Sequence, residues 1–287
     1  MPVGRTLMHV GFVAALLAAS AVRTPVCAVQ GGPFSYSDYA AALKAYVSDD
    51  GMVSYRELKA HRETLDAFVS ALAGLDPKQY AEWPDPAKIA FWLNAYNGLT
   101  LRVIIDHYPI ETSFPASLIY PDNSIRQIRG VWTDIEFPLM GKMMTLDKIE
   151  HEVLRKQFAE PRIHMALVCA AMGCSRLRNE PYTGDRLDAQ LNDQARVFLG
   201  NPAKFRIDRA KKRVYLSPIF DWFGGDFVKE YGTSTEFGGY GETKRAVLSF
   251  ISRHVGEEDR AYLAAGGYDI KWLDYDWSLN EQKAEGK

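Results

Sequence analysis

The segment that most constrains the fold is residues 87–108, AKIAFWLNAYNGLTLRVIIDHY. Prolines precede it and Pro109 follows it, as expected at the two ends of a helix. Apolar residues occupy nearly the whole circumference of this helix, which predicts that it lies buried at the centre of the molecule. Asn94 and Asn97 are three residues apart and share one face. Because buried amides must be hydrogen-bonded, we expect polar groups opposite them.

Periodicity and capping residues predict the other elements. Helices are expected at 35–47, 62–75, 145–158, 185–200, 243–254 and 257–264. Strands are expected at 131–135 and 163–169, with a hairpin of 205–207 and 214–216 and a closing strand over 268–279. The sequence contains no internal repeat, so residues 35–287 are predicted to form a single helix-rich α+β domain. Its small sheet, mostly antiparallel or mixed, would surround the central buried helix.

The first 28 residues have the pattern of a secretory signal peptide. Arg5 precedes an apolar run at 10–22, which is shorter than the roughly 20 residues that a membrane span needs. Val26 and Ala28 occupy the −3 and −1 positions of a small-residue cleavage site. We therefore expect a periplasmic or secreted protein in which residues 29–34 are a linker, without a membrane span in the mature chain.

Charge and cysteine content limit the classes of partner. The formal net charge is −2, so no basic excess points to nucleic acid. Cys27 lacks the small residue expected directly before a lipid-modified cysteine, and it would leave with the signal peptide. Only Cys169 and Cys174 would then remain in an oxidising compartment.

Cys174 is the first candidate catalytic residue. It follows the predicted strand 163–169 and a glycine turn, at an expected helix start where backbone N–H groups would lower a thiol pKa. Arg176 and Arg178 would lower it further. A nucleophile on such an elbow is a recurring catalytic geometry. The alternatives are a small buried side chain or one half of a disulfide with Cys169.

His164 is the candidate general base. Alternation along the predicted strand places His164 and Cys169 on opposite faces, and the returning turn would bring Cys174 to the His164 side. The alternative is a histidine with a purely structural role in the core.

Glu150 is the candidate third member of the site. On the helix predicted over 145–158 it falls within an apolar arc of Leu146, Ile149, Val153 and Leu154, so Glu150 rather than His151 should point inward. A buried carboxylate needs a basic or amide partner, for which the candidates are His164, Arg102 and Arg176. The alternative is a structural Glu–Arg pair.

Metal and cofactor sites are not expected. His164, Cys169 and Cys174 provide three ligands, fewer than a structural zinc site uses. Asp49-Asp50-Gly51 lacks the later ligands of a calcium loop and predicts a turn. An exposed groove lined by Trp132, Trp222 and Phe223 would suit a substrate or a protein partner.

Five motifs together resemble the domain-of-unknown-function family 547. They are FWLNAYNGLTL (91–101), LDKIEHEVLR (146–155), PRIHMALVCAAMGCSRLR (161–178), LSPIFDWFGGDF (216–227) and LDYDWSLN (273–280). The resemblance covers about residues 80–280, and this chain has Ser175 where many members have proline. It implies an exported bacterial protein and selects the positions Asn94, Asn97, Glu150, His164, Cys174 and Asp226. The family's association with glutaredoxin-like modules implies thiol chemistry or partner binding.

These observations lead to two functional hypotheses. In the first, the chain is a thiol-dependent hydrolase or acyl transferase acting on an amide or ester of a small molecule, peptide or envelope component. Cys174 would be its nucleophile, His164 its base and Glu150 the group that orients the base. Asn94, Asn97 or Asp226 would bind substrate or oxyanion. In the second, the chain is a non-enzymatic binding module, and these residues form a structural polar network.

Overall fold

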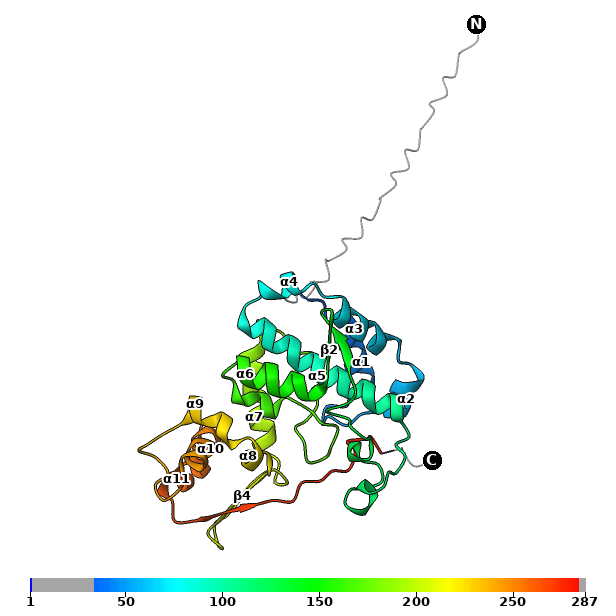
Figure 1. The fold of residues 1–287 in the computed structure, drawn as a ribbon. Coiled ribbons are helices and arrows are strands. Elements are labelled where there is room, and N and C mark those ends of the chain that lie inside the picture. The colour runs from blue at the N-terminus through cyan, green and yellow to red at the C-terminus, as the bar shows by residue number, and fades with distance from the viewer. Residues whose placement is uncertain (2–33, 284–287) are drawn as a thin grey trace. The chain divides into compact units, whose positions relative to one another are not determined.

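The computed structural model describes Met1 and residues 34–283. The predicted signal peptide and nearly all of the predicted linker lie outside the described residues. Helix α5 (Asp85–His107) runs through the middle of the fold (Figure 1), and its side chains from Ala87 to Ile105 are buried almost without interruption. The predicted central helix is therefore confirmed.

Within the described residues, four helices precede α5: α1 (Ser37–Tyr46), α2 (Tyr55–Ala60), α3 (Glu63–Gly74) and α4 (Pro77–Ala81). Helices α1 and α3 match the predicted segments 35–47 and 62–75, whereas α2 and α4 were not predicted. The α1 and α3 helices pack together through Tyr39 and Phe68, whose ring centroids are 4.4 Å apart and stacked. Gly98 of α5 lies directly beneath Phe68, where an added Cβ would come within 2.5 Å of the ring. A glycine at this point lets the helices approach closely.

The predicted strand 163–169 is wrong. This segment forms the 3₁₀ helix η4 (Pro161–Met165) and then continues without regular structure to Cys169. Its backbone is satisfied by a side chain, because Asn97 donates to the carbonyl of Ala166 and accepts from the N–H of Val168. A short apolar run is compatible with any buried conformation, so periodicity could not exclude this one.

The predicted strand 131–135 is also wrong. Residues 131–134 form a turn in which the carbonyl of Gly130 accepts from Thr133 and Asp134. Gly130 has a φ of +62°, a conformation that favours glycine. The strands in this region lie just beyond, as the antiparallel hairpin of β1 (Phe137–Leu139) and β2 (Lys142–Met144).

The second sheet contains three strands. Strand β3 (Phe205–Asp208) pairs antiparallel with β4 (Arg213–Leu216), as the predicted hairpin requires. Strand β5 (Asp269–Trp272) pairs parallel with β4, so the sheet is mixed. Together with the helices this confirms the α+β class. The predicted closing strand 268–279 is regular only over β5.

The remaining helical segments follow α5 along the chain. They are η1 (Ala116–Leu118), η2 (Ile125–Gln127), η3 (Lys148–Leu154), α6 (Arg155–Gln157), α7 (Leu187–Leu199), α8 (Ile219–Trp222), η5 (Gly224–Phe227), α9 (Val228–Tyr231), α10 (Glu242–Ser252) and α11 (Glu257–Ala265). Segment η3 is a π-helix, a form that occurs often at functional sites. Thr145 accepts from the N–H of Lys148 and begins it, as predicted. Within the described residues, none of the helices has the length and apolar character needed to span a bilayer.

The chain beyond β5 returns to the N-terminal helices (Figure 1). On its way, the N–H groups of Met172 and Gly173 donate to the carbonyls of Ser278 and Asp276. Isolated bridges pair Ala171 with Leu279 and Val53 with Glu281. The C-terminal segment 276–281 therefore lies across the loop that carries the two cysteines and is hydrogen-bonded to it.

Candidate functional site

A cavity of about 290 Å³ lies among segments that are far apart in the sequence. Aromatic side chains form much of its wall: Tyr96, Trp132, Trp222, Phe223, Tyr275 and Trp277. Titratable side chains line the rest: Arg126, Asp147, Glu150, His151, His164, Cys169 and Cys174. Three of the predicted site residues, Cys174, His164 and Glu150, therefore meet in one cavity. The groove residues Trp132, Trp222 and Phe223 line it as well.

Cys174 lies on the loop that the C-terminal segment covers. Its sulfur accepts the backbone N–H of Cys169 at 3.1 Å and donates to the carbonyl of Leu167 at 3.4 Å. Both cysteines are free, and the Cys169 sulfur lies 3.0 Å from the Tyr275 hydroxyl. Ala170, between them, has a φ of +54°, which is unusual for a residue with a Cβ. This strained turn points the amide of Cys169 at the Cys174 sulfur.

The two thiols have opposite ionisation tendencies. Burial opposes ionisation of Cys174, but hydrogen bonds from the Cys169 side chain and amide, with the charge of Lys204, hold the pKa of Cys174 below its usual value. The Cys169 thiol shifts the other way: its hydrogen bond with Cys174, together with burial, raises the pKa of Cys169 well above its usual value. Lys204 is itself buried and donates to the carbonyls of Met172 and Cys174, at 2.7 Å for the latter. Cys174 is therefore the thiol that this loop prepares as a thiolate.

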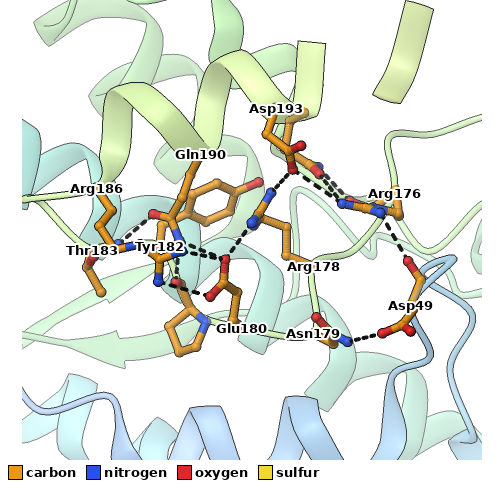
Figure 2. A network of polar contacts seen from close by, with 12 residues as sticks. Asp49, Arg176, Arg178, Asn179, Glu180, Tyr182, Thr183, Arg186, Gln190 and Asp193 are labelled. Carbon is orange, nitrogen blue, oxygen red and sulfur yellow. Dashed lines mark hydrogen bonds and ion pairs between the residues drawn. The ribbon is translucent and has the colours of Figure 1, made fainter. Parts of the chain in front are cut away.

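The prediction that Arg176 and Arg178 activate Cys174 finds no support in their contacts. Figure 2 shows both side chains turned toward other partners. Arg176 donates to the carbonyl of Asp49 and pairs with Asp193 of α7, and Arg178 pairs with Asp193 and Glu180. The predicted helix start after Cys174 is also wrong, because residues 174–186 contain no helix. Their irregular backbone is held by this polar network instead.

His164 is held by Asp226. Its Nε2 lies 2.8 Å from Asp226 Oδ2, and its ring stacks on Phe223 with centroids 4.2 Å apart. Arg155 binds the same carboxylate through both Nε and Nη2, at 2.6 and 2.9 Å. Burial lowers the pKa of His164, so the ring is neutral near pH 7. Because the carboxylate accepts, Nε2 carries the proton and Nδ1 is the basic nitrogen.

Asp226 is therefore the residue that orients His164, a role that the sequence analysis gave to Glu150. Although burial opposes ionisation, the hydrogen bonds from His164 and Arg155 hold the pKa of Asp226 well below its usual range. Asp226 does not line the cavity, so its predicted role in binding substrate or oxyanion finds no support. Among residues 34–283, no hydrogen bond joins Cys174 to a histidine.

Glu150 is buried, with 9% of its surface exposed, as the helical arc predicted. Burial raises its pKa to about 7, and the Tyr96 hydroxyl and the Arg155 charge offset that effect only in part. Its neighbours thus differ from the predicted partners His164, Arg102 and Arg176. Arg102 instead pairs with Asp66 and Asp106.

His151, which the arc argument turned away from the core, lies between Asp147 and Arg155. Its Nε2 is 3.4 Å from the Asp147 carboxylate, and its Nδ1 is 2.6 Å from Arg155. Unlike Glu150, its side chain is 37% exposed, in agreement with the expectation that Glu150 is the inward residue of the two.

Asn94 and Asn97 are buried and do not line the cavity, so their predicted role as oxyanion donors finds no support in the structure. Asn94 donates to the carbonyl of Tyr182 and accepts its N–H, in the same two-bond pattern that Asn97 makes with 166–168. Each side-chain amide therefore makes the pair of backbone hydrogen bonds that a neighbouring strand would make if the segment were part of a sheet. The polar groups expected opposite them are main-chain groups.

Sequence reasoning missed Tyr96, Tyr275, Trp277 and Arg126 as cavity residues. Tyr275 and Trp277 contact each other with centroids 4.5 Å apart, and Trp277 stacks on Trp222 at 6.2 Å. The aromatic motif LDYDWSLN could have identified Tyr275 and Trp277, and Tyr96 lies in the motif FWLNAYNGLTL, whereas Arg126 lies in none of the five motifs. No grouping of three or more His, Cys, Asp or Glu side chains suited to a metal ion occurs within the described part of the chain.

The comparisons with known proteins give one match. The family DUF547, described as a protein of unknown function, matches residues 80–199. No curated protein and no solved structure matches the chain significantly. The matched region supplies Tyr96, Glu150, His164 and both cysteines to the cavity, and the chain beyond it completes the aromatic wall. Residues 80–199 of this chain therefore resemble the DUF547 family.

Proposed function

We propose that the protein is a thiol-dependent acyl-transferring enzyme, a hydrolase or acyl transferase that acts on an ester or amide. The observation that carries the proposal is that Cys174, His164 and Glu150 line one small aromatic-walled cavity. A nucleophile, a base and an acid in one cavity are the parts that acyl transfer needs. The surroundings lower the pKa of Cys174 and raise the pKa of Glu150, which supports Cys174 as the nucleophile and Glu150 as the acid.

The steps follow from these roles. The Cys174 thiolate attacks the substrate carbonyl carbon, and the tetrahedral intermediate expels an alcohol or amine that takes its proton from the Glu150 carboxyl. A thioester on Cys174 remains. His164, oriented by Asp226, removes a proton from water or from an acceptor alcohol or amine, which attacks the thioester and releases the thiolate. The proton on His164 then returns to the Glu150 carboxylate through solvent, so that both groups regain their starting protonation states. Tyr96 and Tyr275 line the cavity, and their hydroxyls are the proposed hydrogen-bond donors to the oxyanion.

A non-enzymatic binding module is the second candidate. It is favoured by the hydrogen bonds of His164, whose Nε2 is directed to Asp226 rather than to Cys174. In this case the buried polar groups stabilise the fold, and the aromatic wall binds a small molecule or a protein partner.

We also propose that the protein is exported to the periplasm or secreted. The apolar run 10–22 and the small residues Val26 and Ala28 support this. N-terminal sequencing of the protein recovered from the cell envelope or medium should find Val29 first. Recovery of the chain with an intact N-terminus would contradict the proposal.

Trapping the acyl-enzyme tests the catalytic proposal. The protein is mixed with a panel of p-nitrophenyl esters, quenched in acid and analysed by intact-mass and fragment-ion spectrometry. We expect an acyl adduct on Cys174, present in the Cys169→Ser variant and absent in Cys174→Ser. Release of p-nitrophenol should fall at least about 100-fold in Cys174→Ser, the usual scale for loss of a nucleophile.

His164→Asn should slow breakdown of the adduct, so that the acyl-enzyme accumulates. If no ester of the panel acylates Cys174 and Cys174→Ser matches the parent protein, the enzyme proposal is wrong. The binding-module candidate then takes its place.

A further inference from the structure

Arg126 stands where the reactive cavity meets a second hollow. It lines the cavity of Cys174 and also an open groove of about 770 Å³ formed by residues between 113 and 133. Trp132 is the other residue that both share. A molecule that extended from the cavity into the groove would therefore lie beside Arg126 and Trp132.

The Arg126 guanidinium is held by aromatic rings. Its central carbon lies 4.5 Å from the centroid of Tyr120, 5.5 Å from Trp132 and 5.1 Å from Trp277. Nη2 also donates to the Tyr120 hydroxyl at 2.7 Å. Rings on several sides fix the position of the cation without neutralising it.

Arg126 differs in this respect from the other arginine near the cavity. Arg155 is neutralised by the bidentate bond to Asp226. Within residues 34–283, by contrast, no carboxylate forms an ion pair with Arg126. The cavity thus presents one fixed positive charge that the described part of the protein leaves unmatched.

We infer that Arg126 is the subsite for a carboxylate of the ligand, so that the substrates are carboxylate-bearing esters or amides. A guanidinium binds a carboxylate through two parallel hydrogen bonds, which orients as well as attracts it. A single cation matches a singly charged carboxylate, and Asp147 on the same cavity wall disfavours a doubly charged phosphate. The substrate class rests on the proposed function, whereas carboxylate binding does not.

Binding is measured on the full mature chain carrying Cys174→Ser, so that no chemistry intervenes. The probes are phenylacetate and its neutral isostere phenylacetamide, and the readout is the fluorescence of the tryptophans around Arg126. We expect phenylacetate to bind at least about tenfold more tightly, a preference that Arg126→Gln abolishes. Arg129, exposed in the same groove, provides the control, because Arg129→Gln should keep the preference.

Arg126→Lys keeps the charge but not the two-pronged geometry, and it should show an intermediate preference even if the Gln variant folds poorly. Circular dichroism verifies the fold of each variant. Equal affinity for the two probes, including no detectable binding of either, overturns the inference.

Turnover separates this inference from the proposed function. With Cys174 intact, a p-nitrophenyl hemisuccinate should acylate the protein with a lower KM than the uncharged p-nitrophenyl butyrate. Acylation of Cys174 without any preference for carboxylate would leave the enzyme proposal standing and remove Arg126 from it. Carboxylate binding without acylation of Cys174 would leave the Arg126 inference standing and contradict the enzyme proposal.

Discussion

At the level of single residues, Glu150 shows how strongly surroundings change a side chain. A glutamate in water ionises well below neutral pH, but burial raises the pKa of Glu150 to about 7. Cys174 shifts in the opposite direction, because an amide donor and the Lys204 charge favour its thiolate. At neutral pH the site can therefore contain a proton donor and a nucleophile together.

The shift of Glu150 predicts a pH-dependent stability difference. Between its usual pKa of 4.5 and the raised pKa of about 7, Glu150 binds its proton more tightly in the folded protein than in the unfolded chain, so its stability contribution falls as pH rises through this range. Glu150→Gln removes that dependence. Relative to the parent protein, the Gln variant should gain about 3 kcal/mol between pH 4.5 and pH 8.

Urea unfolding of both proteins at several pH values measures this difference. Glu152, on the same helical segment and exposed, is the control, and Glu152→Gln should show no such trend. A constant difference between Glu150→Gln and the parent protein would mean that folding does not change the pKa of the Glu150 carboxyl.

At the level of elements, helix α5 does more than fill the core. Asn97 satisfies the backbone of 166–168, which has no strand neighbour, and so holds the segment between His164 and Cys169. Asn94 does the same for Tyr182. Asn97 thus positions a segment whose Leu167 lines the cavity, whereas the Tyr182 that Asn94 holds does not line it.

Replacement of Asn97 tests this role. Asn97→Leu leaves a buried carbonyl and a buried N–H without partners, each at a cost of about 1–3 kcal/mol, so we expect a loss of roughly 3 kcal/mol. Thr100→Val is the matched control one turn away, since Thr100 donates only to the carbonyl of Tyr96 within the helix. It should cost about 1 kcal/mol or less.

Chemical unfolding of both variants gives the comparison. Equal destabilisation by the two substitutions would show that the Asn97 contacts carry no particular weight.

At the level of the whole molecule, the cavity exists because the chain returns on itself. The aromatic residues Tyr275 and Trp277 close one side only because segment 275–280 is bonded across the cysteine loop. Gly173 is the point of closest approach, where a Cβ would meet Tyr275 at 2.8 Å and the Asp276 backbone at 2.9 Å.

Gly173→Ala should push these segments apart. We expect destabilisation of about 1–3 kcal/mol, the usual cost of overpacking, together with faster alkylation of Cys174 by iodoacetamide as the cover loosens. Gly238→Ala is the control, because nothing lies within 4 Å of its added Cβ. Unchanged melting and labelling of Gly173→Ala would show that the C-terminal segment does not close the site.

Local pattern was sufficient for the central helix, the main helices, the hairpin of β3 and β4 and the inward direction of Glu150. These features depend on periodicity and on residues adjacent in sequence. The same pattern failed for 131–135 and 163–169, where a turn at Gly130 and the side chain of Asn97 replace strand pairing. A buried apolar run does not specify what satisfies its backbone.

Which residues of the site contact one another could be determined only from the folded chain. The sequence marked Cys174, His164 and Glu150, but the partner of His164 is Asp226, 62 residues away, and the wall at Tyr275 and Trp277 is about 100 residues from Cys174. Hydrogen bonds act over about 3 Å, so partners are chosen by spatial proximity rather than by spacing along the chain. Residue type shows which groups can react, whereas packing decides which of them meet.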